Sequence, residues 1–368
     1  MMSYKKEDIM NALRHVHDPD LKQDLVTLNM IEEVIIEGKK IKVKVVLTTP
    51  ACPLKELITQ ECEDAIHGYV DEKAEVEINM TSKVTTVRQD NMEMLADVKN
   101  IIAVGSGKGG VGKSTVAVNL AVSLAKSGAR VGLIDADIYG PSIPLMFGLV
   151  NEKPHGYEKN GKMVVEPFQK FGLKLLSIGF FVDNTKALVW RGPMASMALK
   201  QLFTDADWGT LDYMIIDLPP GTGDIPLTLI QSFPLTGAVI VSTPQEVAIS
   251  DVRKAADMFR NEKLKIHLIG LVENMAWFSP PDMQDKKYYI FGKGGCQKFA
   301  DELNIPLLGQ IPIIAEISES GDNGSPIVVN DKSAVSEAFR KLAESIAQQV
   351  AINNVININM PEAGVLFS

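Results

Sequence analysis

Residues 101–115 read Ile-Ile-Ala-Val-Gly-Ser-Gly-Lys-Gly-Gly-Val-Gly-Lys-Ser-Thr. The apolar run Ile101–Val104 predicts a short buried strand, and the spacing of apolar residues over 116–126 predicts a helix. Between them, Gly107–Ser114 fits the phosphate-loop pattern G-x-x-x-x-G-K-[ST]. Such a turn points backbone N–H groups at one centre, and the helix start adds the positive end of its dipole. The stretch therefore predicts a phosphate site in an α/β domain.

The residue types in this loop suit a nucleoside triphosphate with Mg²⁺. Glycines let the backbone turn tightly around the phosphates. Lys113 can reach the β- and γ-phosphates, and the Ser114 hydroxyl can bind Mg²⁺. We therefore expect ATP to be bound by the whole loop: Gly107, Lys108, Gly109, Gly110, Val111, Gly112, Lys113, Ser114 and Thr115.

Carboxylates follow two further apolar runs. Residues 131–134 predict a buried strand that ends in Asp135-Ala-Asp137, and residues 213–216 predict another that ends in Asp217. Carboxylates at strand ends beside a phosphate loop are placed to serve Mg²⁺ and water. Asp217 fits the Walker B position, which holds Mg²⁺ through water. We therefore predict Ser114, Asp135 and Asp217 as the magnesium site.

Helix and strand patterns alternate from Lys99 on. This alternation predicts a mostly parallel sheet wrapped by helices, a P-loop NTPase domain over 99–352. Residues 1–82 predict a small α+β domain, and the polar segment 83–98 predicts a linker. Residues 353–368 remain as a C-terminal tail.

Composition narrows the class of partners. The net charge is −9, no basic block is present, and no apolar run approaches the roughly 20 residues that span a bilayer. The first residues carry no hydrophobic signal core. We therefore expect a cytoplasmic protein that binds neither nucleic acid nor membrane.

Lys108 is not required by the general phosphate-loop pattern. With it, Gly-Lys-Gly-Gly-Val-Gly-Lys-Ser-Thr resembles the deviant phosphate loop of the nitrogenase iron protein, MinD, ParA and the Mrp/ApbC-type ATPases. Other segments are similar to the last group, the iron–sulfur cluster carrier ATPases with an N-terminal MIP-type domain. These segments are Asp18-Pro-Asp20, Thr49-Pro-Ala-Cys-Pro53, Asp135–Ser142, Trp190-Arg-Gly-Pro193, Asp217–Asp224 and Val272-Glu-Asn-Met275.

This resemblance implies a homodimer in which Lys108 reaches the partner's nucleotide. It implies that Asp137 lies near the attacking water during slow ATP hydrolysis, and that Asn274 contacts the base. It also implies a [4Fe–4S] cluster that is handed to apoprotein clients.

The chain departs from the family at the cluster ligands. Many members carry C-x-x-C shortly after Glu-Asn-Met, whereas residues 277–284 read Trp-Phe-Ser-Pro-Pro-Asp-Met-Gln. Cys62 falls on the apolar face of a predicted helix, which leaves Cys52 and Cys296 as candidate ligands. Both precede expected helix starts, where a thiolate is favoured. Two thiolates per subunit would give the four of a bridging cluster, with a strong dependence on Cys296. A structural loop role for Cys52 stays open.

Two other functions compete with the carrier. One is a nucleotide-switched positioning ATPase of the ParA or MinD kind, which would act on DNA or a membrane. The net negative charge argues against DNA binding. Residues 352–360 lack the basic amphipathic face of an interfacial helix, which argues against membrane binding. The other is an ATP-dependent scaffold without a cluster, which a steady-state ATPase measurement separates from the carrier.

Overall fold

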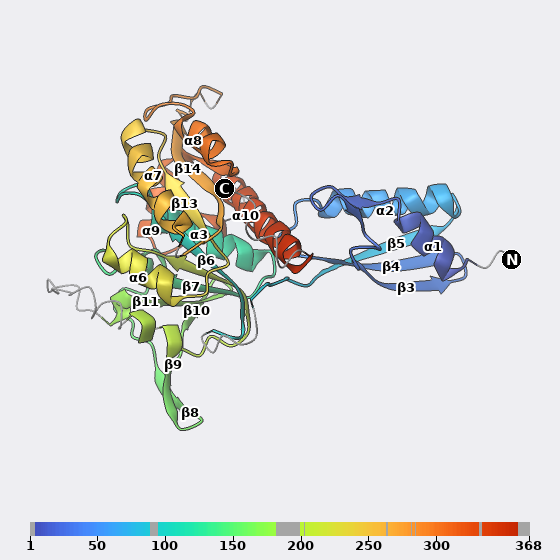
Figure 1. The fold of residues 1–368 in the computed structure, drawn as a ribbon, viewed down its shortest axis with the longest axis horizontal. Coiled ribbons are helices and arrows are strands. Elements are labelled where there is room, and N and C mark those ends of the chain that lie inside the picture. Colours follow the sequence, from blue (N-terminus) through green and yellow to red (C-terminus); the bar gives the residue numbers. More distant parts are fainter. Residues whose placement is uncertain are drawn as a thin grey trace. The chain divides into compact units, whose positions relative to one another are not determined.

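The computed structural model describes residues 4–88, 95–181, 199–201, 203–262, 264–280, 282–283, 285–330 and 333–359. The chain divides into two compact units, one of residues 1–87 with 347–368 and one of residues 88–346. Within the described ranges, no helix is long and apolar enough to cross a membrane. Figure 1 shows the elements in chain order.

The larger unit is built on one eight-stranded sheet of order β10-β11-β7-β12-β6-β13-β14-β15. All neighbouring pairs are parallel except β10 with β11. The central strands consist of buried residues, as expected for a parallel sheet covered on both faces. The predicted fold class is confirmed. The strands are β6 (Val98–Gly105), β7 (Val131–Asp135), β10 (Phe168–Lys170), β11 (Leu173–Ser177), β12 (Leu211–Asp217), β13 (Gly237–Ser242), β14 (Leu268–Phe278) and β15 (Leu307–Ile313).

Helices of the larger unit pack on this sheet. Helix α3 contacts β6, β7, β11, β12 and β13, whereas α7 contacts β13 and β14, and α8 contacts β14 and β15. The helices are α3 (Lys113–Lys126), α4 (Ile143–Met146), α6 (Asp224–Ser232), α7 (Glu246–Arg260), α8 (Gly295–Leu303), α9 (Ala315–Asp322) and α10 (Ala334–Asn359), with short 3₁₀ turns at Ile178–Phe180 and Ile327–Val329. Helix α10 continues past residue 352, where the sequence predicts the P-loop NTPase domain to end, and residues from 347 on count with the smaller unit.

The strand order explains where the site forms. Strand β12 lies between β6 and β7, with Asp217 paired to Val104 on one side and to Asp135 on the other. The sheet extends from β6 in both directions, and ligands of open α/β sheets bind at the carboxyl ends of strands around such a point. The fold therefore places both strand-end aspartates beside the phosphate loop.

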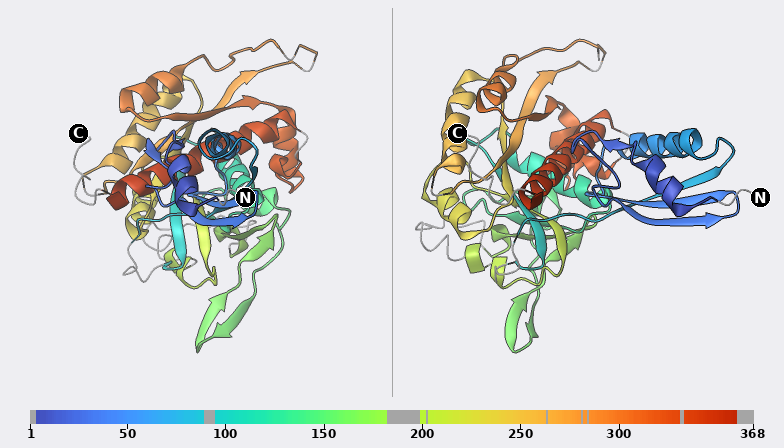
Figure 2. Two further views of the ribbon diagram at one scale, coloured as in Figure 1. Left: turned by 90° about the vertical axis from the view of Figure 1, so that its right-hand side faces the viewer. Right: turned by 45° about the vertical axis from the view of Figure 1, so that its right-hand side comes forward.

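A β-hairpin projects from the larger unit (Figures 1 and 2, green). It pairs β8 (Gly156–Lys159) with β9 (Lys162–Val165) around Asn160 and Gly161, whose φ angles are 53° and 77°. Asn-Gly with both residues at positive φ is the preferred two-residue hairpin turn. The dipeptide is therefore the sequence signal for this hairpin, which lies within the segment between the predicted strands at 131–134 and 213–216.

The smaller unit has a three-stranded sheet of order β3-β4-β5, covered by α1 and α2. Alternate residues of β4, from Ile41 to Leu47, are buried, as the sequence predicts. Cys62 is fully buried in α2, which confirms its place on the apolar face. The elements are α1 (Lys6–Leu13), β1 (His17–Asp18), β2 (Gln23–Asp24), β3 (Ile31–Glu37), β4 (Lys40–Leu47), α2 (Lys55–Tyr69) and β5 (Glu75–Ser82).

Candidate nucleotide site

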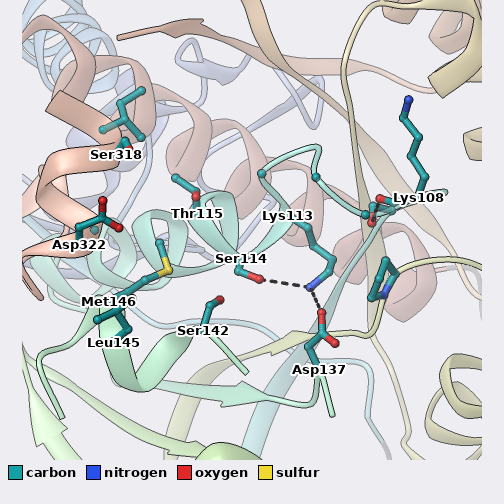
Figure 3. A pocket seen from close by; sticks show the side chains of 17 residues that line it. Lys108, Lys113, Ser114, Thr115, Asp137, Ser142, Leu145, Met146, Ser318 and Asp322 are labelled. Carbon is teal, nitrogen blue, oxygen red and sulfur yellow. Dashed lines mark hydrogen bonds and ion pairs between the residues drawn. The ribbon is translucent and has the colours of Figure 1, made fainter. Parts of the chain in front are cut away.

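A pocket of about 330 Å³ opens over the phosphate loop in the larger unit (Figure 3). The loop forms one side, and α4 and α9 form another. Asp137 and Pro220 come from the segments that follow β7 and β12. The lining residues are Ser106, Lys108, Gly109, Gly110, Gly112, Lys113, Ser114, Thr115, Asp137, Ser142, Leu145, Met146, Pro220, Ile317, Ser318, Gly321 and Asp322.

The turn into α3 depends on Gly112. Its φ is 81°, in the left-handed region, and a Cβ there would lie 2.1 Å from the Asn274 amide nitrogen. That nitrogen donates to the carbonyl of Val111 at 2.8 Å. Asn274 therefore supports the loop from β14 and is not among the residues that line the pocket. Its contact with the base stays a prediction.

Lys113 forms the centre of the site. It is the first residue of α3 and only 6% exposed. Its Nζ donates to Asp217 Oδ1 at 2.6 Å and to Ser114 Oγ at 3.3 Å, and lies 3.5 Å from Asp137 Oδ2. Burial lowers the pKa of Lys113, but the charges of Asp217 and Asp137 outweigh burial and raise it overall. The ligand-free site therefore holds a charged lysine against the carboxylates.

The carboxylates at the strand ends fit a magnesium site. Both oxygens of Asp135 accept hydrogen bonds, from the backbone N–H groups of Asp137 and Ile143 and from the Ser177 hydroxyl at 2.9–3.2 Å. Asp217 differs, because its Oδ2 is buried with no hydrogen-bond partner among the described residues. A buried carboxylate oxygen without a donor is the ligand that a hard cation prefers. Asp217 and Ser114 are therefore the residues that best fit Mg²⁺, with Asp135 placed behind them.

Asp135 makes the stability of the ligand-free protein depend on pH. Burial, and then the charge of Asp217, raise the pKa of Asp135 to about 7. The folded chain then keeps a proton that the unfolded chain releases near pH 4, so stability falls as pH rises from about 4 to 7. The slope from one proton is at most about 1.4 kcal/mol per pH unit.

Asp135→Asn should remove this slope. Urea unfolding at pH 5, 6, 7 and 8 measures it through tryptophan fluorescence, because Trp190, Trp208 and Trp277 all fall in the larger unit. The wild-type free energy of unfolding should fall relative to the variant between pH 5 and 7. If the free energies of unfolding of wild type and variant changed in parallel from pH 5 to 8, Asp135 would be ionised in the folded protein at every one of these pH values.

Asp137 and Lys108 differ in how they face the pocket. Asp137 points toward Lys113, whereas the Lys108 side chain extends away from Lys113, Ser114 and Asp137 (Figure 3). The loop turn at Lys108 is fixed through its carbonyl, which accepts from the Ser106 hydroxyl at 3.0 Å. The Lys108 ammonium therefore lies apart from the Lys113, Ser114 and Asp137 side chains of the same pocket.

The wall of the pocket formed by α4 and α9 could not be predicted from the sequence. Leu145 and Met146 of α4 and Ile317, Ser318 and Asp322 of α9 contribute to it. These residues carry no motif, and α9 lies about 200 positions after the loop in sequence. Only the packing of α4 on α9 brings them to the nucleotide site. The Trp190-Arg-Gly-Pro193 segment lies outside the described residues.

Cys296, a predicted cluster ligand, lies where a thiolate is disfavoured in the absence of a metal. Helix α8 does begin at Gly295, but Cys296 is 0% exposed and its Sγ lies 3.7 Å from the carbonyl of Thr243. Burial, and then the nearby Glu273 carboxylate, raise the pKa of this thiol far above its usual value. A bridging cluster needs ligands at the subunit surface, so Cys296 does not fit that role as placed.

Cys52 remains as a partly exposed cysteine in the smaller unit. Helix α2 begins at Lys55, and Pro53 and Leu54 form a turn before it. Cys52 therefore lies in the loop before the helix and not at its first turn. No group of three or more metal-binding side chains occurs among the residues that the structure describes.

Two family profiles match the chain. The profile described as "NUBPL iron-transfer P-loop NTPase" matches residues 97–347, and the profile described as "Iron-sulfur cluster assembly protein" matches residues 6–79. The first profile covers the phosphate loop, both strand-end aspartates and Asn274. The second covers the loop that holds Cys52.

Curated proteins and one solved structure show the same relationship. An iron–sulfur cluster carrier protein of Synechocystis sp. is 46% identical over 346 residues, which cover 94% of this chain and 97% of that protein. A carrier protein of Escherichia coli is 40% identical, with 93% of this chain and 91% of that protein covered. A nucleotide-binding protein of Archaeoglobus fulgidus, solved with ADP, is 41% identical with a TM-score of 0.55, covering 63% of this chain and 89% of its own.

Proposed function

Because the chain belongs to the iron–sulfur cluster carrier proteins, a family of iron-transfer P-loop NTPases, we propose that it binds and slowly hydrolyses ATP with Mg²⁺ in transferring a cluster to apoproteins. The observation that carries the ATP assignment is the pairing of Lys113 with Asp217 beneath the pocket. Identity of 46% over 94% of the chain to a carrier favours this function over a positioning ATPase.

ATP binding would exchange the partners of Lys113. In the ligand-free site the ammonium neutralises Asp217 and Asp137. When phosphates enter the loop, Lys113 turns to them, and the helix start of α3 adds its N–H groups. Asp217 and Ser114 would then be the residues that hold Mg²⁺, and the ion would supply positive charge at the phosphate oxygens. Asp137 is left at the pocket wall, where it can orient a water molecule.

We propose that two subunits face each other when ATP is bound. Lys108 points away from Lys113 and Asp137 of its own subunit. The phosphates that it could reach are therefore those of a nucleotide bound to the facing subunit. A second cation there would stabilise charge in the transition state. The two loops would meet across a twofold axis.

Lys108→Ala should therefore bind ATP nearly as well as wild type but hydrolyse it about a hundredfold more slowly. Light scattering with a non-hydrolysable ATP analogue should show a wild-type dimer. Lys162→Ala serves as control, because Lys162 is an exposed lysine of β9 that lines neither the pocket nor the loop. A monomer in every nucleotide state, or full turnover by Lys108→Ala, contradicts the proposal. Absence of steady-state turnover in wild type would favour a scaffold.

The ligands of the cluster have to be found without a C-x-x-C pair after Glu-Asn-Met. The C-x-x-C pair is absent from residues 277–284, and Cys296 is buried. We propose that Cys52 is the ligand that this chain contributes. One thiolate per subunit gives two across a dimer, and thiols of another molecule would complete the four that a [4Fe–4S] cluster takes. Such a cluster would be labile and oxygen-sensitive, which suits transfer.

Anaerobic reconstitution with iron, sulfide and a low-molecular-weight thiol tests this. Wild type should gain charge-transfer absorbance and bound iron, and Cys52→Ser should lose most of both. Cys296→Ser should keep them, in contrast to what the sequence alone predicts. Cys62→Ser is the matched control for a buried thiol. Loss of iron in Cys296→Ser but not in Cys52→Ser would return the ligand role to Cys296.

A further inference from the structure

The nucleotide pocket has two ends that differ in charge (Figure 3). Lys113 and Asp137 lie at one end, Ser318 and Asp322 of α9 line the other, and Thr115 lies between them. The lysines that line the pocket both belong to the phosphate loop. Among the described residues, the α9 end therefore has a lining carboxylate and no lining cation.

The phosphate loop sets the direction in which a nucleotide would lie, and this step rests on the proposed ATP site. The lysine of a P-loop reaches the β- and γ-phosphates, whereas N–H groups of the loop and of the helix start hold the α- and β-phosphates. The nucleoside therefore follows on the side of Ser114 and Thr115 that faces away from Lys113. On that side α9 forms the wall of the pocket, so we expect the ribose beside Ser318 and Asp322 (Figure 3).

Asp322 presents a carboxylate that no other side chain neutralises. It is exposed at the rim of the pocket and makes no hydrogen bond or ion pair with any residue that the structure describes. A carboxylate without a cation repels phosphate oxygens, so the part of a nucleotide beside it must offer hydrogen-bond donors. The neighbouring 2′- and 3′-hydroxyls of ribose are such donors, and an acidic side chain takes this role at the ribose of dinucleotide sites.

A close contact between two turns holds Asp322 in place. Gly324 has a φ of 68°, and a Cβ there would lie 2.5 Å from the backbone nitrogen of Gly148. The turn that follows α9 therefore packs backbone against backbone on the turn that follows α4. This contact fixes the end of α9, where Asp322 lies, before a ligand arrives, and a fixed contact group lowers the entropy cost of binding.

Three hydroxyl groups make the rest of this end of the pocket polar. The side chains of Thr115, Ser142 and Ser318 line it, and none of them has a hydrogen-bond partner among the described residues. Hydroxyls can donate as well as accept. They therefore suit a ligand whose sugar and α-phosphate carry both donors and acceptors.

We propose that Asp322 is a specificity-determining residue that makes this site prefer ribonucleotides. Its two carboxylate oxygens would accept from the 2′- and 3′-hydroxyls of the bound nucleotide, one oxygen for each hydroxyl. An analogue that lacks one hydroxyl leaves a carboxylate oxygen facing the sugar without a donor, and a site built for a hydroxyl rejects such analogues. The two carboxylates of the pocket thus have separate tasks, Asp137 beside Lys113 and Asp322 at the sugar.

Calorimetric titration with ADP, 2′-deoxy-ADP and 3′-deoxy-ADP, each with Mg²⁺, tests the proposal without hydrolysis. Wild type should bind each deoxynucleotide about tenfold more weakly than ADP, the loss of one charge-assisted hydrogen bond. Asp322→Ala should weaken ADP binding and bind all three nucleotides with equal affinity. Asp322→Asn should retain part of the preference, because the amide offers one acceptor oxygen in place of two.

Glu319→Gln is the matched control, because Glu319 is an exposed carboxylate of the same helix that does not line the pocket. It should keep the affinity and the preference of wild type. Equal binding of the three nucleotides by wild type, or an unchanged preference in Asp322→Ala, would overturn this inference while the ATP site stands. Absence of ADP binding by wild type would instead contradict the proposed function, and this inference with it.

Discussion

Replacing Lys113 by alanine is expected to weaken ATP binding by roughly a hundredfold or more, because the charge-assisted hydrogen bonds to the phosphates are lost. The same change should destabilise the ligand-free protein. Lys113 holds Asp217 at 2.6 Å in a fully buried position, and removal of the lysine leaves that carboxylate without its partner. Breaking a buried pair in this way costs about 3 kcal/mol.

The two effects can be measured apart. Calorimetry with an ATP analogue and Mg²⁺ gives the affinity, and urea unfolding without nucleotide gives the stability. Lys113→Ala/Asp217→Asn should recover part of the stability, since the amide carries no charge, but none of the affinity. Lys162→Ala should change neither. Wild-type ATP affinity in Lys113→Ala would refute the nucleotide site itself.

Asp137→Asn should reduce ATP turnover by roughly a hundredfold or more while ATP stays bound. Two carboxylates line the pocket, those of Asp137 and Asp322, and Asp137 is the one that lies beside Lys113. We expect Asp137 to orient water at the γ-phosphate, because Lys113 is the residue that reaches this phosphate. Its Oδ2 also lies 3.5 Å from Lys113, so its neutralisation frees the lysine for phosphate, and ATP affinity should stay equal or rise slightly.

Single-turnover hydrolysis with saturating enzyme separates chemistry from binding. Asp301→Asn is a suitable control, because Asp301 is an exposed carboxylate of α8 far in sequence from the loop. Wild-type turnover in Asp137→Asn would move the water-positioning role to another residue. Loss of ATP binding in the same variant would show that Asp137 serves binding instead.

The sequence predicted the parts of the fold that depend on local patterns. The phosphate loop fixes a strand, a turn and a helix within 15 residues, and runs of buried apolar residues ending in aspartate fix β7 and β12. Parallel strands bring their carboxyl ends to one edge, so the proximity of Asp135 and Asp217 follows from the pattern.

The remaining features depend on contacts between distant segments. The wall formed by α4 and α9 has no motif, and its place depends on packing between helices far apart in sequence. The burial of Cys296 is a second feature that the local sequence does not predict. A helix does start at this glycine-rich segment, one residue before Cys296 instead of after it, but whether a helix start is exposed depends on what packs over it. Here Thr243 and Glu273 enclose it, so burial outweighs the helix dipole.

The phosphate loop is held on three sides before any nucleotide arrives. Asn274 holds the carbonyl of Val111, and the N–H of Gly221 donates to the carbonyl of Ser106 at 2.9 Å. Gly107 packs so tightly on α7 that a Cβ would lie 2.3 Å from the backbone of Asp251. Ordering a loop lowers its conformational entropy. Because this loop is already ordered in the folded protein, nucleotide binding does not have to order it, and the affinity is higher for that reason. Substitutions that loosen α7 or β14 should therefore weaken nucleotide affinity without touching a phosphate.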